Sequence, residues 1–218
     1  MNKDNIFEEV RNVRNDFTKF TLLEADIDAD PFSQFKKWMQ AAFEVDNETA
    51  NAMILSTVDD TAMPSSRVML LRGIDNGGFS FFTNYESHKG NQLEQNKNAA
   101  LCFFWSALQR QVRIQGVIKK LSENESDEYF SSRPFESKVG AWVSKQSKVV
   151  KNRAEIDDAF TALLANSTPD IKRPPHWGGF VLIPNKIEFW QGRASRLHDR
   201  FLYTLIENNT WKIERLSP

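Results

Sequence analysis

The chain has 218 residues, a formal net charge of −1 and a sequence pI of about 6.3, a size that suits one domain and a charge balance that favours no nucleic-acid partner. Its one cysteine, Cys102, excludes an intrachain disulfide, which fits a reducing compartment. The N-terminus lacks a signal-peptide pattern, and no apolar run approaches the about 18 residues that cross a bilayer. We therefore expect a cytoplasmic protein that binds neither nucleic acid nor membrane.

The N-terminal part is predicted to be helical. Apolar residues recur at helical spacing through the first 20 residues, at Ile6, Phe7, Val10, Val13 and Phe17. Asp30 before Pro31 predicts a second helix, because a capping residue precedes a residue whose backbone is pre-set for the first turn. We expect one domain over residues 1–218, with this helical segment at about residues 1–46.

Strand patterns dominate the rest of the chain. Strands are predicted at 52–59, 64–74, 78–84, 99–106, 110–122, 178–184, 186–192, 200–207 and 210–216. In 110–122, alternation with polar residues places three side chains on one face: Val112, Ile114 and Ile118. Further helices are predicted at 87–95, after the capping box of Ser122 with Glu125, and at about 150–164. Many antiparallel strands with helices at the sides indicate a mainly β (α+β) fold, a small barrel with appended helices.

A basic loop follows the strand at 186–192. Within eight residues it carries Arg193, Arg196, His198 and Arg200, with Asp199 as the single carboxylate. Crowded like charges raise the Coulomb energy, which a bound anion would lower, and the planar guanidinium suits a phosphate or carboxylate. Aromatic residues flank the loop on both sides: Phe189, Trp190, Phe201 and Tyr203. The pattern favours a site for a flat anionic ligand over a solvated basic loop.

Other polar groups fit the same kind of ligand. The strand segment RVMLLR has Arg67 and Arg72 at its ends, on opposite faces unless the strand twists or bulges; taken alone, they would be edge charges. Tyr129, Arg133 and Ser137 are spaced four apart, so a helix would align them as phosphate donors, although a proline interrupts that helix. The segment GAWVSKQS offers further donors, or a polar end to a helix.

Reactive side chains are scarce. The three histidines, His88, His176 and His198, are far apart in sequence, and without an HExxH motif or a cysteine pair no metal site is predicted. No G-x-S-x-G motif occurs, and Cys102 lies in an apolar strand. Many binding groups with few reactive ones indicate that a cofactor supplies the chemistry.

In chain order, the segments RVMLLR, YFSSRPFES, GAWVSKQS, IEFWQG and RLHDRFLY resemble the pyridoxamine 5′-phosphate oxidase family, over nearly the whole chain. The resemblance implies an FMN-binding split β-barrel, a homodimer with shared active sites and an N-terminal lid. It implies oxidation of pyridoxamine 5′-phosphate and pyridoxine 5′-phosphate by O2 to pyridoxal 5′-phosphate, the active form of vitamin B6, with release of H2O2. Four residues differ from those usual in the family: Phe17, Thr49, Arg72 and His88.

The resemblance also implies a role for individual residues. Those expected to contact FMN are Arg67, Val68, Met69, Leu70, Leu71, Arg72, Phe82, Thr83, His88, Lys89, Gln111, Gln146, Ser147, Trp190 and Arg200. Those expected to contact the substrate are Arg14, Arg72, Tyr129, Arg133, Ser137, Arg196 and His198. Arg196 and His198 are the expected catalytic residues: Arg196 presses the substrate ring against the flavin, and His198 orients the substrate or handles its proton.

Two other functions stay open. A split barrel of this kind that lacks oxidase activity could bind FMN for flavin carriage or regulation, but that function leaves the expected substrate residues unexplained. The other is a flavin oxidoreductase that acts on a different substrate.

Overall fold

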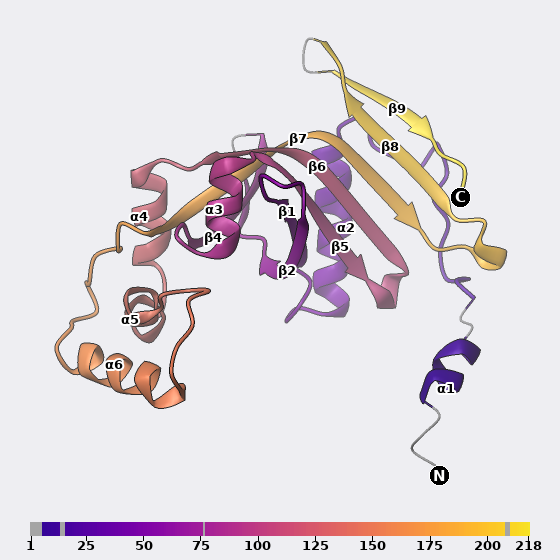
Figure 1. The fold of residues 1–218 in the computed structure, drawn as a ribbon. Coiled ribbons are helices and arrows are strands. Elements are labelled where there is room, and N and C mark those ends of the chain that lie inside the picture. Colours follow the sequence, from indigo (N-terminus) through magenta and orange to yellow (C-terminus); the bar gives the residue numbers. More distant parts are fainter. Residues whose placement is uncertain (1–5, 14–15, 76, 208–209) are drawn as a thin grey trace.

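The computed structural model describes residues 6–13, 16–75, 77–207 and 210–218 (Figure 1). The α-helices and strands, labelled as in Figure 1, are α1 (Ile6–Asn12), α2 (Pro31–Val45), β1 (Ala52–Val58), β2 (Pro64–Leu70), β3 (Gly73–Asp75), β4 (Gly78–Asn84), α3 (His88–Gln95), β5 (Asn98–Trp105), β6 (Arg110–Lys120), α4 (Glu123–Ser131), α5 (Phe135–Val143), α6 (Arg153–Ala165), β7 (Trp177–Gln191), β8 (Asp199–Leu205) and β9 (Trp211–Arg215). None of these helices is long and apolar enough to cross a membrane.

Within the described residues, nine strands form one curled sheet in which every pairing is antiparallel. The strand order is β2-β1-β5-β6-β7-β4-β3, with β8 and β9 continuing from β7. The long strand β7 joins two parts of the sheet, because its first half pairs with β4 and its second half with β8. The curled antiparallel sheet with flanking helices (Figure 1) confirms the predicted fold class, a mainly β split barrel.

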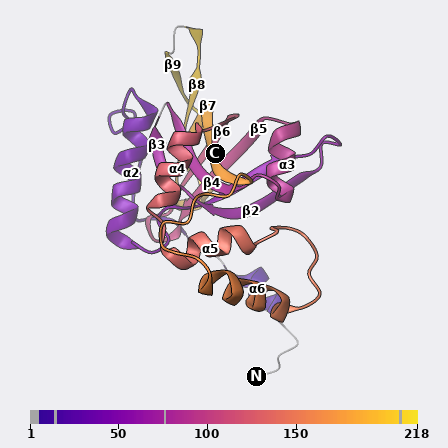
Figure 2. The same cartoon turned by 90° about the vertical axis from the view of Figure 1, so that its left-hand side faces the viewer.

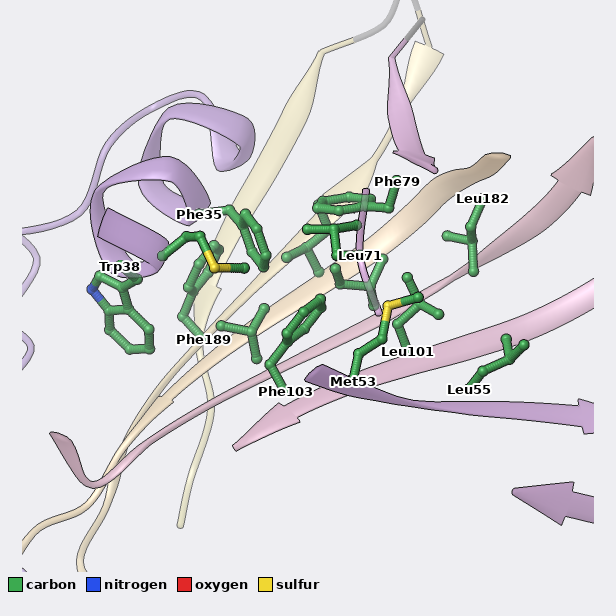
Figure 3. Packing of buried hydrophobic residues seen from close by; sticks show 14 of the residues in the cluster. Phe35, Trp38, Met53, Leu55, Leu71, Phe79, Leu101, Phe103, Leu182 and Phe189 are labelled. Atoms are coloured by element: carbon green, nitrogen blue, oxygen red, sulfur yellow. The ribbon is translucent and has the colours of Figure 1, made fainter. Parts of the chain in front are cut away.

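The core lies between α2 and the sheet. Asp30 caps α2 through hydrogen bonds from the backbone N–H groups of its first turn, as predicted. Phe35 then packs edge-on against Phe79 and Phe103, with ring centroids 5.0 and 5.1 Å apart. Trp38, one turn later, packs edge-on against Phe189 at 5.2 Å (Figure 3). Burial of such aromatic side chains supplies about 1.5–3 kcal/mol each, so this face of α2 is a main anchor of the sheet.

Two strands that were predicted separately form a single strand in the structure. The segments 178–184 and 186–192 are continuous as β7, although Pro184 lacks a backbone N–H for the ladder. The register between β6 and β7 shifts at Gln115/Gly116, opposite this proline, and such an irregularity tolerates it. Gly116 allows the close approach, because a Cβ there would lie 2.1 Å from the carbonyl oxygen of Ile183. The segment 64–74 is divided instead, into β2 and β3.

The helix predicted through the first 20 residues was wrong in its extent. Among the described residues α1 ends at Asn12, and its apolar side chains are exposed, with Phe7 74% and Val10 62% accessible. The segment from Asp16 to Leu22 is not helical. Side chains far along the sequence hold it: Gln109 accepts a hydrogen bond from the backbone of Lys19, and Asp199 accepts one from Leu22. These tertiary contacts override the helical spacing.

Helices α4, α5 and α6 gather at one end of the sheet, and the β8–β9 hairpin lies at the other (Figure 1). Figure 2 shows α5 beside α6 when that end faces the viewer, and the two helices pack together. The capping box of Ser122 with Glu125 starts α4 as predicted. Pro134 separates α4 from α5, so Tyr129 and Ser137 lie on different helices rather than on one aligned face.

Candidate functional site

A pocket of about 310 Å³ lies where β2 and β4 meet α4 and α5. It brings together nine residues that the sequence predicts for FMN or substrate: Val68, Met69, Leu70, Arg72, Phe82, Thr83, Tyr129, Arg133 and Gln146. Four lining residues were not predicted: Asn84, Ala141, Ser144 and Trp177. Stacked rings form one wall, with Phe82 parallel to Tyr129 at 3.8 Å between centroids and to Trp177 at 5.7 Å. Aromatic faces of this kind suit a flat ligand.

Lys89 lies beside this pocket as a buried cation with neutral partners. Its Nζ donates hydrogen bonds to Thr83 Oγ1 at 2.9 Å, Ser87 Oγ at 3.1 Å and Gln146 Oε1 at 2.8 Å. Burial, and secondly the charge of Arg67, lower the pKa of Lys89 from 10.5 to about 8. A buried ammonium without a carboxylate is an arrangement that an anion would stabilise.

Arg67 lies close enough to Lys89 to lower its pKa and is also held by neutral groups. Its guanidinium donates to the carbonyl oxygen of Leu55 at 3.1 Å, to Thr57 Oγ1 at 2.7 Å and to Ser65 Oγ at 2.6 Å. Burial lowers the pKa of Arg67. Within the described part of the chain, neither cation forms an ion pair with a carboxylate. We call Arg67 and Lys89 the first cation pair.

Arg72 and Arg133 form a second cation pair in the lining of the pocket. The Arg133 guanidinium carbon lies 4.5 Å from the ring centroid of Trp177, and that of Arg72 lies 5.9 Å from the ring centroid of Tyr129. Burial, and to a lesser degree Arg72, lower the pKa of Arg133. Its Nη1 is buried and has no hydrogen-bond partner among the described residues. An unsatisfied buried donor is uncommon, and a bound anion would satisfy it.

Four further predicted residues are not part of the pocket lining. Leu71 is buried and donates its backbone N–H to the carbonyl oxygen of Asn51. Ser137 is exposed in the first turns of α5, His88 is exposed at the start of α3, and Ser147 is exposed with a positive φ of 72°. Arg14, predicted for the lid, lies outside the described residues.

The remaining predicted residues form a second group, at the end of the sheet formed by β6, β7 and β8. Gln111 pairs in register with Trp190, and Trp190 pairs with Arg200, so the three lie in one row across three strands. Arg196 and His198 follow in the loop between β7 and β8. The pocket lining contains none of these five residues. One chain therefore carries the predicted site in two separate parts.

His198 is packed and hydrogen-bonded. Its ring lies 4.5 Å from Trp190 and 5.9 Å from Phe17 between centroids, and its Nδ1 accepts a hydrogen bond from the backbone N–H of Arg193 at 3.1 Å. Burial, followed by the charges of Arg196 and Arg200, lowers the pKa of His198. The ring is therefore kept neutral near pH 7.

The arginines of the basic loop differ in their partners. Arg193 donates to Asp199 at 2.8 Å, and Arg200 donates to Glu188 at 2.9 Å, so both are engaged in ion pairs within the chain. Arg196 is exposed, and no ion pair or hydrogen bond engages its guanidinium within the described residues. Among the described residues of this loop, Arg196 is thus the one guanidinium left available to a ligand.

Sequence reasoning missed Asp199 as an organising residue. Its buried carboxylate accepts hydrogen bonds from the backbone of Leu22 at 3.0 Å and from Arg193 and Arg215, each at 2.8 Å. Burial raises the pKa of Asp199, but these hydrogen bonds and the charge of Arg193 hold it below its usual value. The signal was present, because a single acid among several arginines has a ready set of partners.

Among the described residues, no group of three or more His, Cys, Asp or Glu side chains is placed to hold a metal ion.

Comparison with known proteins gives a consistent family. Residues 39–166 match a family model described as pyridoxamine 5′-phosphate oxidase, and residues 177–218 match one described as the pyridoxine 5′-phosphate oxidase C-terminal dimerisation region. A pyridoxine/pyridoxamine 5′-phosphate oxidase of Nostoc punctiforme is 50% identical over 210 residues, covering 96% of this chain and 98% of the relative. One of Burkholderia mallei is 48% identical over 209 residues, covering 95% and 98%.

Two solved structures extend the comparison. PhzG from Burkholderia lata, in complex with tetrahydrophenazine-1-carboxylic acid, aligns with a TM-score of 0.84 at 29% identity, covering 92% of this chain and 99% of that one. A pyridoxamine 5′-phosphate oxidase-related FMN-binding protein from Nostoc punctiforme aligns with a TM-score of 0.71 at 18% identity, covering 88% and 100%, which supports the fold. The matches over nearly the full length, together with the split-barrel fold, establish that this chain belongs to the pyridoxamine 5′-phosphate oxidase family.

Proposed function

We propose that the protein is an FMN-dependent oxidase of pyridoxamine 5′-phosphate and pyridoxine 5′-phosphate. The alcohol and O2 give pyridoxal 5′-phosphate and H2O2; the amine also consumes water and releases ammonia. The observation that carries the proposal is the presence of two cation pairs beside one pocket, neither neutralised by a carboxylate among the described residues. Two such pairs suit two phosphorylated molecules, a cofactor and a substrate.

The first cation pair fits the phosphate of FMN. Lys89 and Arg67 supply two positive charges, and Thr83 and Gln146 connect them to the pocket through hydrogen bonds and shared lining. The strand β2 is an edge of the sheet, so backbone groups on its free side are available to the polar rim of a flavin ring. When bound, FMN would supply the acceptor for the hydride from the substrate carbon and the route of electrons to O2.

The second cation pair fits the phosphate of the substrate. Arg133 offers its unpaired Nη1, Arg72 adds a second guanidinium, and Tyr129 adds a phenol in the same pocket. Ser137, exposed on α5, is the remaining proposed donor. A phosphate held here would anchor the pyridine ring and reduce the entropy lost on reaching the reactive orientation.

The second group of residues would complete the site of the other subunit. Within one chain it is separate from the pocket, and four of its five residues, Trp190, Arg196, His198 and Arg200, fall within the match to the dimerisation region. We therefore assign Arg196 and His198 of the partner subunit to the substrate bound in each pocket. Gln111, Trp190 and Arg200 of the same partner subunit would face the flavin. A two-fold axis would form two such sites at once. Residues 1–218 would form one domain, with about 1–46, including Arg14, contributing the lid.

The chemistry proposed for the chain's own residues is orientation and charge stabilisation. The exposed guanidinium of Arg196 would press the substrate ring against the flavin and stabilise charge at the reacting carbon. Nδ1 of His198 already accepts a hydrogen bond, so in the neutral ring Nε2 carries the proton and is free to act as a donor to the substrate. This favours orientation of the substrate by His198 over acceptance of its proton.

The similarity to PhzG supports a second candidate. That protein was solved with a polycyclic carboxylic acid that carries no phosphate, and a guanidinium pair can also bind a carboxylate. Oxidation of such an acid by this chain would place a carboxylate, in place of a phosphate, at the second cation pair. The absence of oxidase activity with retained FMN would instead favour the flavin-binding module.

One assay separates the three. Purified protein reconstituted with FMN is given pyridoxamine 5′-phosphate, pyridoxine 5′-phosphate or tetrahydrophenazine-1-carboxylic acid in air, and aldehyde and peroxide are measured. We expect both from the two phosphorylated substrates. Peroxide from the phenazine acid alone would establish the second candidate, and bound flavin with no product from any of them would establish the module.

A further inference from the structure

The loop that carries Arg196 has an unfavourable backbone conformation. Two consecutive residues other than glycine, Ser195 and Arg196, have positive φ values of 55° and 61°. This left-handed region is disfavoured for residues with a Cβ, and such conformations persist where surrounding contacts enforce them. A contact that enforces this one would decide where the Arg196 guanidinium points.

Asp16 makes that contact from the opposite end of the sequence. Its Oδ1 accepts a hydrogen bond from the backbone N–H of Ser195 at 3.0 Å, across 179 positions of the chain. A carboxylate acceptor makes a charge-assisted hydrogen bond, which is stronger than one between neutral groups. The bond ends on the first of the two left-handed residues, directly before Arg196.

The neighbouring Phe17 fixes Asp16 against the loop. Its ring packs edge-on against Trp190 at 5.7 Å between centroids and lies 5.9 Å from His198. Gly192 makes room for it, because a Cβ at that position would lie 2.7 Å from the Cβ of Phe17. Polar and aromatic contacts therefore hold Asp16 and Phe17 against the loop between β7 and β8.

We propose that Asp16 is a positioning residue for Arg196: its carboxylate holds the left-handed backbone at Ser195 and so directs the Arg196 guanidinium. The catalytic part of this inference rests on the proposed function, since it assigns Arg196 to the substrate. The conformational part depends only on the chain itself.

A double-mutant cycle tests the catalytic part. With wild-type protein, we expect Asp16→Ala to lower kcat/KM about 10- to 100-fold at unchanged FMN content, the range that a misplacement of about 1 Å produces. In an Arg196→Ala background the same substitution should change kcat/KM less than about twofold, because the group it positions is gone. Asp26→Ala is the matched control, since Asp26 is an exposed carboxylate that accepts a hydrogen bond from the backbone N–H of Leu23 and, among the described residues, forms no hydrogen bond or ion pair with the loop.

Limited trypsin digestion of the flavin-free, substrate-free protein tests the conformational part without any activity. Cleavage after Arg196, located by mass spectrometry, should be at least about threefold faster in Asp16→Ala than in wild type or Asp26→Ala, because the loop opens more often. Equal losses of kcat/KM in the two backgrounds, or unchanged cleavage after Arg196, would overturn the proposal. Failure of the proposed function would appear separately, as wild-type protein that turns over no substrate.

Discussion

The backbone N–H of Arg193 donates to Nδ1 of His198 across 3.1 Å. A backbone N–H group can only donate a hydrogen bond, so Nδ1 must accept with its lone pair, and the proton of the neutral ring lies on Nε2. Protonation of Nδ1 would break this hydrogen bond and set two donors against each other. The loop between β7 and β8 is therefore compatible with a neutral His198 and opposes a charged one.

This relationship predicts how stability depends on pH. The folded pKa of His198 is lowered by burial, Arg196 and Arg200, whereas the unfolded ring titrates near 6.5. Between these two pKa values the unfolded chain binds more protons, so this contribution is complete above about pH 6.5 and is lost as pH falls through the folded pKa. Thermal unfolding from about pH 7.5 to 5 should show the loss in wild type and in His176→Gln, but not in His198→Gln. Identical pH profiles for wild type and His198→Gln would contradict it.

Lys89 predicts a pH dependence of flavin affinity in the opposite direction. The pKa of Lys89 in the flavin-free protein is about 8, so above that pH its neutral amine must take up a proton before it can pair with a phosphate as an ammonium. Affinity for FMN should fall about 10- to 30-fold between about pH 7 and 9.5, since a phosphate monoester is already a dianion there. Titrations of apoprotein measure this, and Lys89→Met should give a weak affinity that no longer changes with pH.

Removal of either member of the first cation pair should weaken FMN binding before it affects the fold. A charge-assisted hydrogen bond contributes about 1.5–3 kcal/mol, so Arg67→Ala and Lys89→Met should each lose about 10- to 150-fold in affinity. Lys120→Met is a control, because that exposed lysine pairs with Glu94 away from the pocket. Unchanged affinity in both variants would mean that the phosphate binds elsewhere.

The β-sheet was largely predictable because alternation reports burial directly. Val112, Ile114 and Ile118 of β6 are buried, as their spacing predicted. The end of the first helix was not predictable, because its apolar side chains pack against no core, and backbone N–H groups of the following segment donate hydrogen bonds to the side chains of Gln109 and Asp199. Local propensity gave way to contacts that only the fold creates.

The candidate site was predicted as a set of residues but not as a geometry. Family motifs named both the pocket residues and the row formed by Gln111, Trp190 and Arg200, yet nothing in the sequence placed them at separate positions. That separation follows from strand order, since β2 is one edge of the sheet whereas β8 continues from the far half of β7. Pairing of Arg193 with Asp199 was likewise invisible until the loop was folded.

Separation of the two groups predicts that flavin binding and dimerisation are linked. A ligand held by residues of both subunits binds the dimer better than the monomer and stabilises it by mass action. Sedimentation velocity at several protein concentrations should show the dimer persisting to lower concentration with FMN than without it. A monomer that binds FMN as tightly as the dimer would refute the shared site.

Arg196 and Arg133 should affect different kinetic constants. Arg196→Ala should lower kcat/KM about 100-fold, mainly through kcat, if its guanidinium stabilises charge that develops in the transition state. Arg196→Lys should recover only part, because an ammonium lacks the planar fork. Arg133→Ala should instead raise KM about 10- to 150-fold with a smaller change in kcat, since a phosphate handle binds ground state and transition state alike.

Steady-state kinetics, with flavin content measured for each variant, tests these expectations. Arg153→Ala is the control, because Arg153 is an exposed arginine of α6 paired with Asp157. If Arg196→Ala loses flavin but turns over normally in the fraction that retains it, Arg196 belongs to the cofactor site and the roles assigned to the loop are wrong.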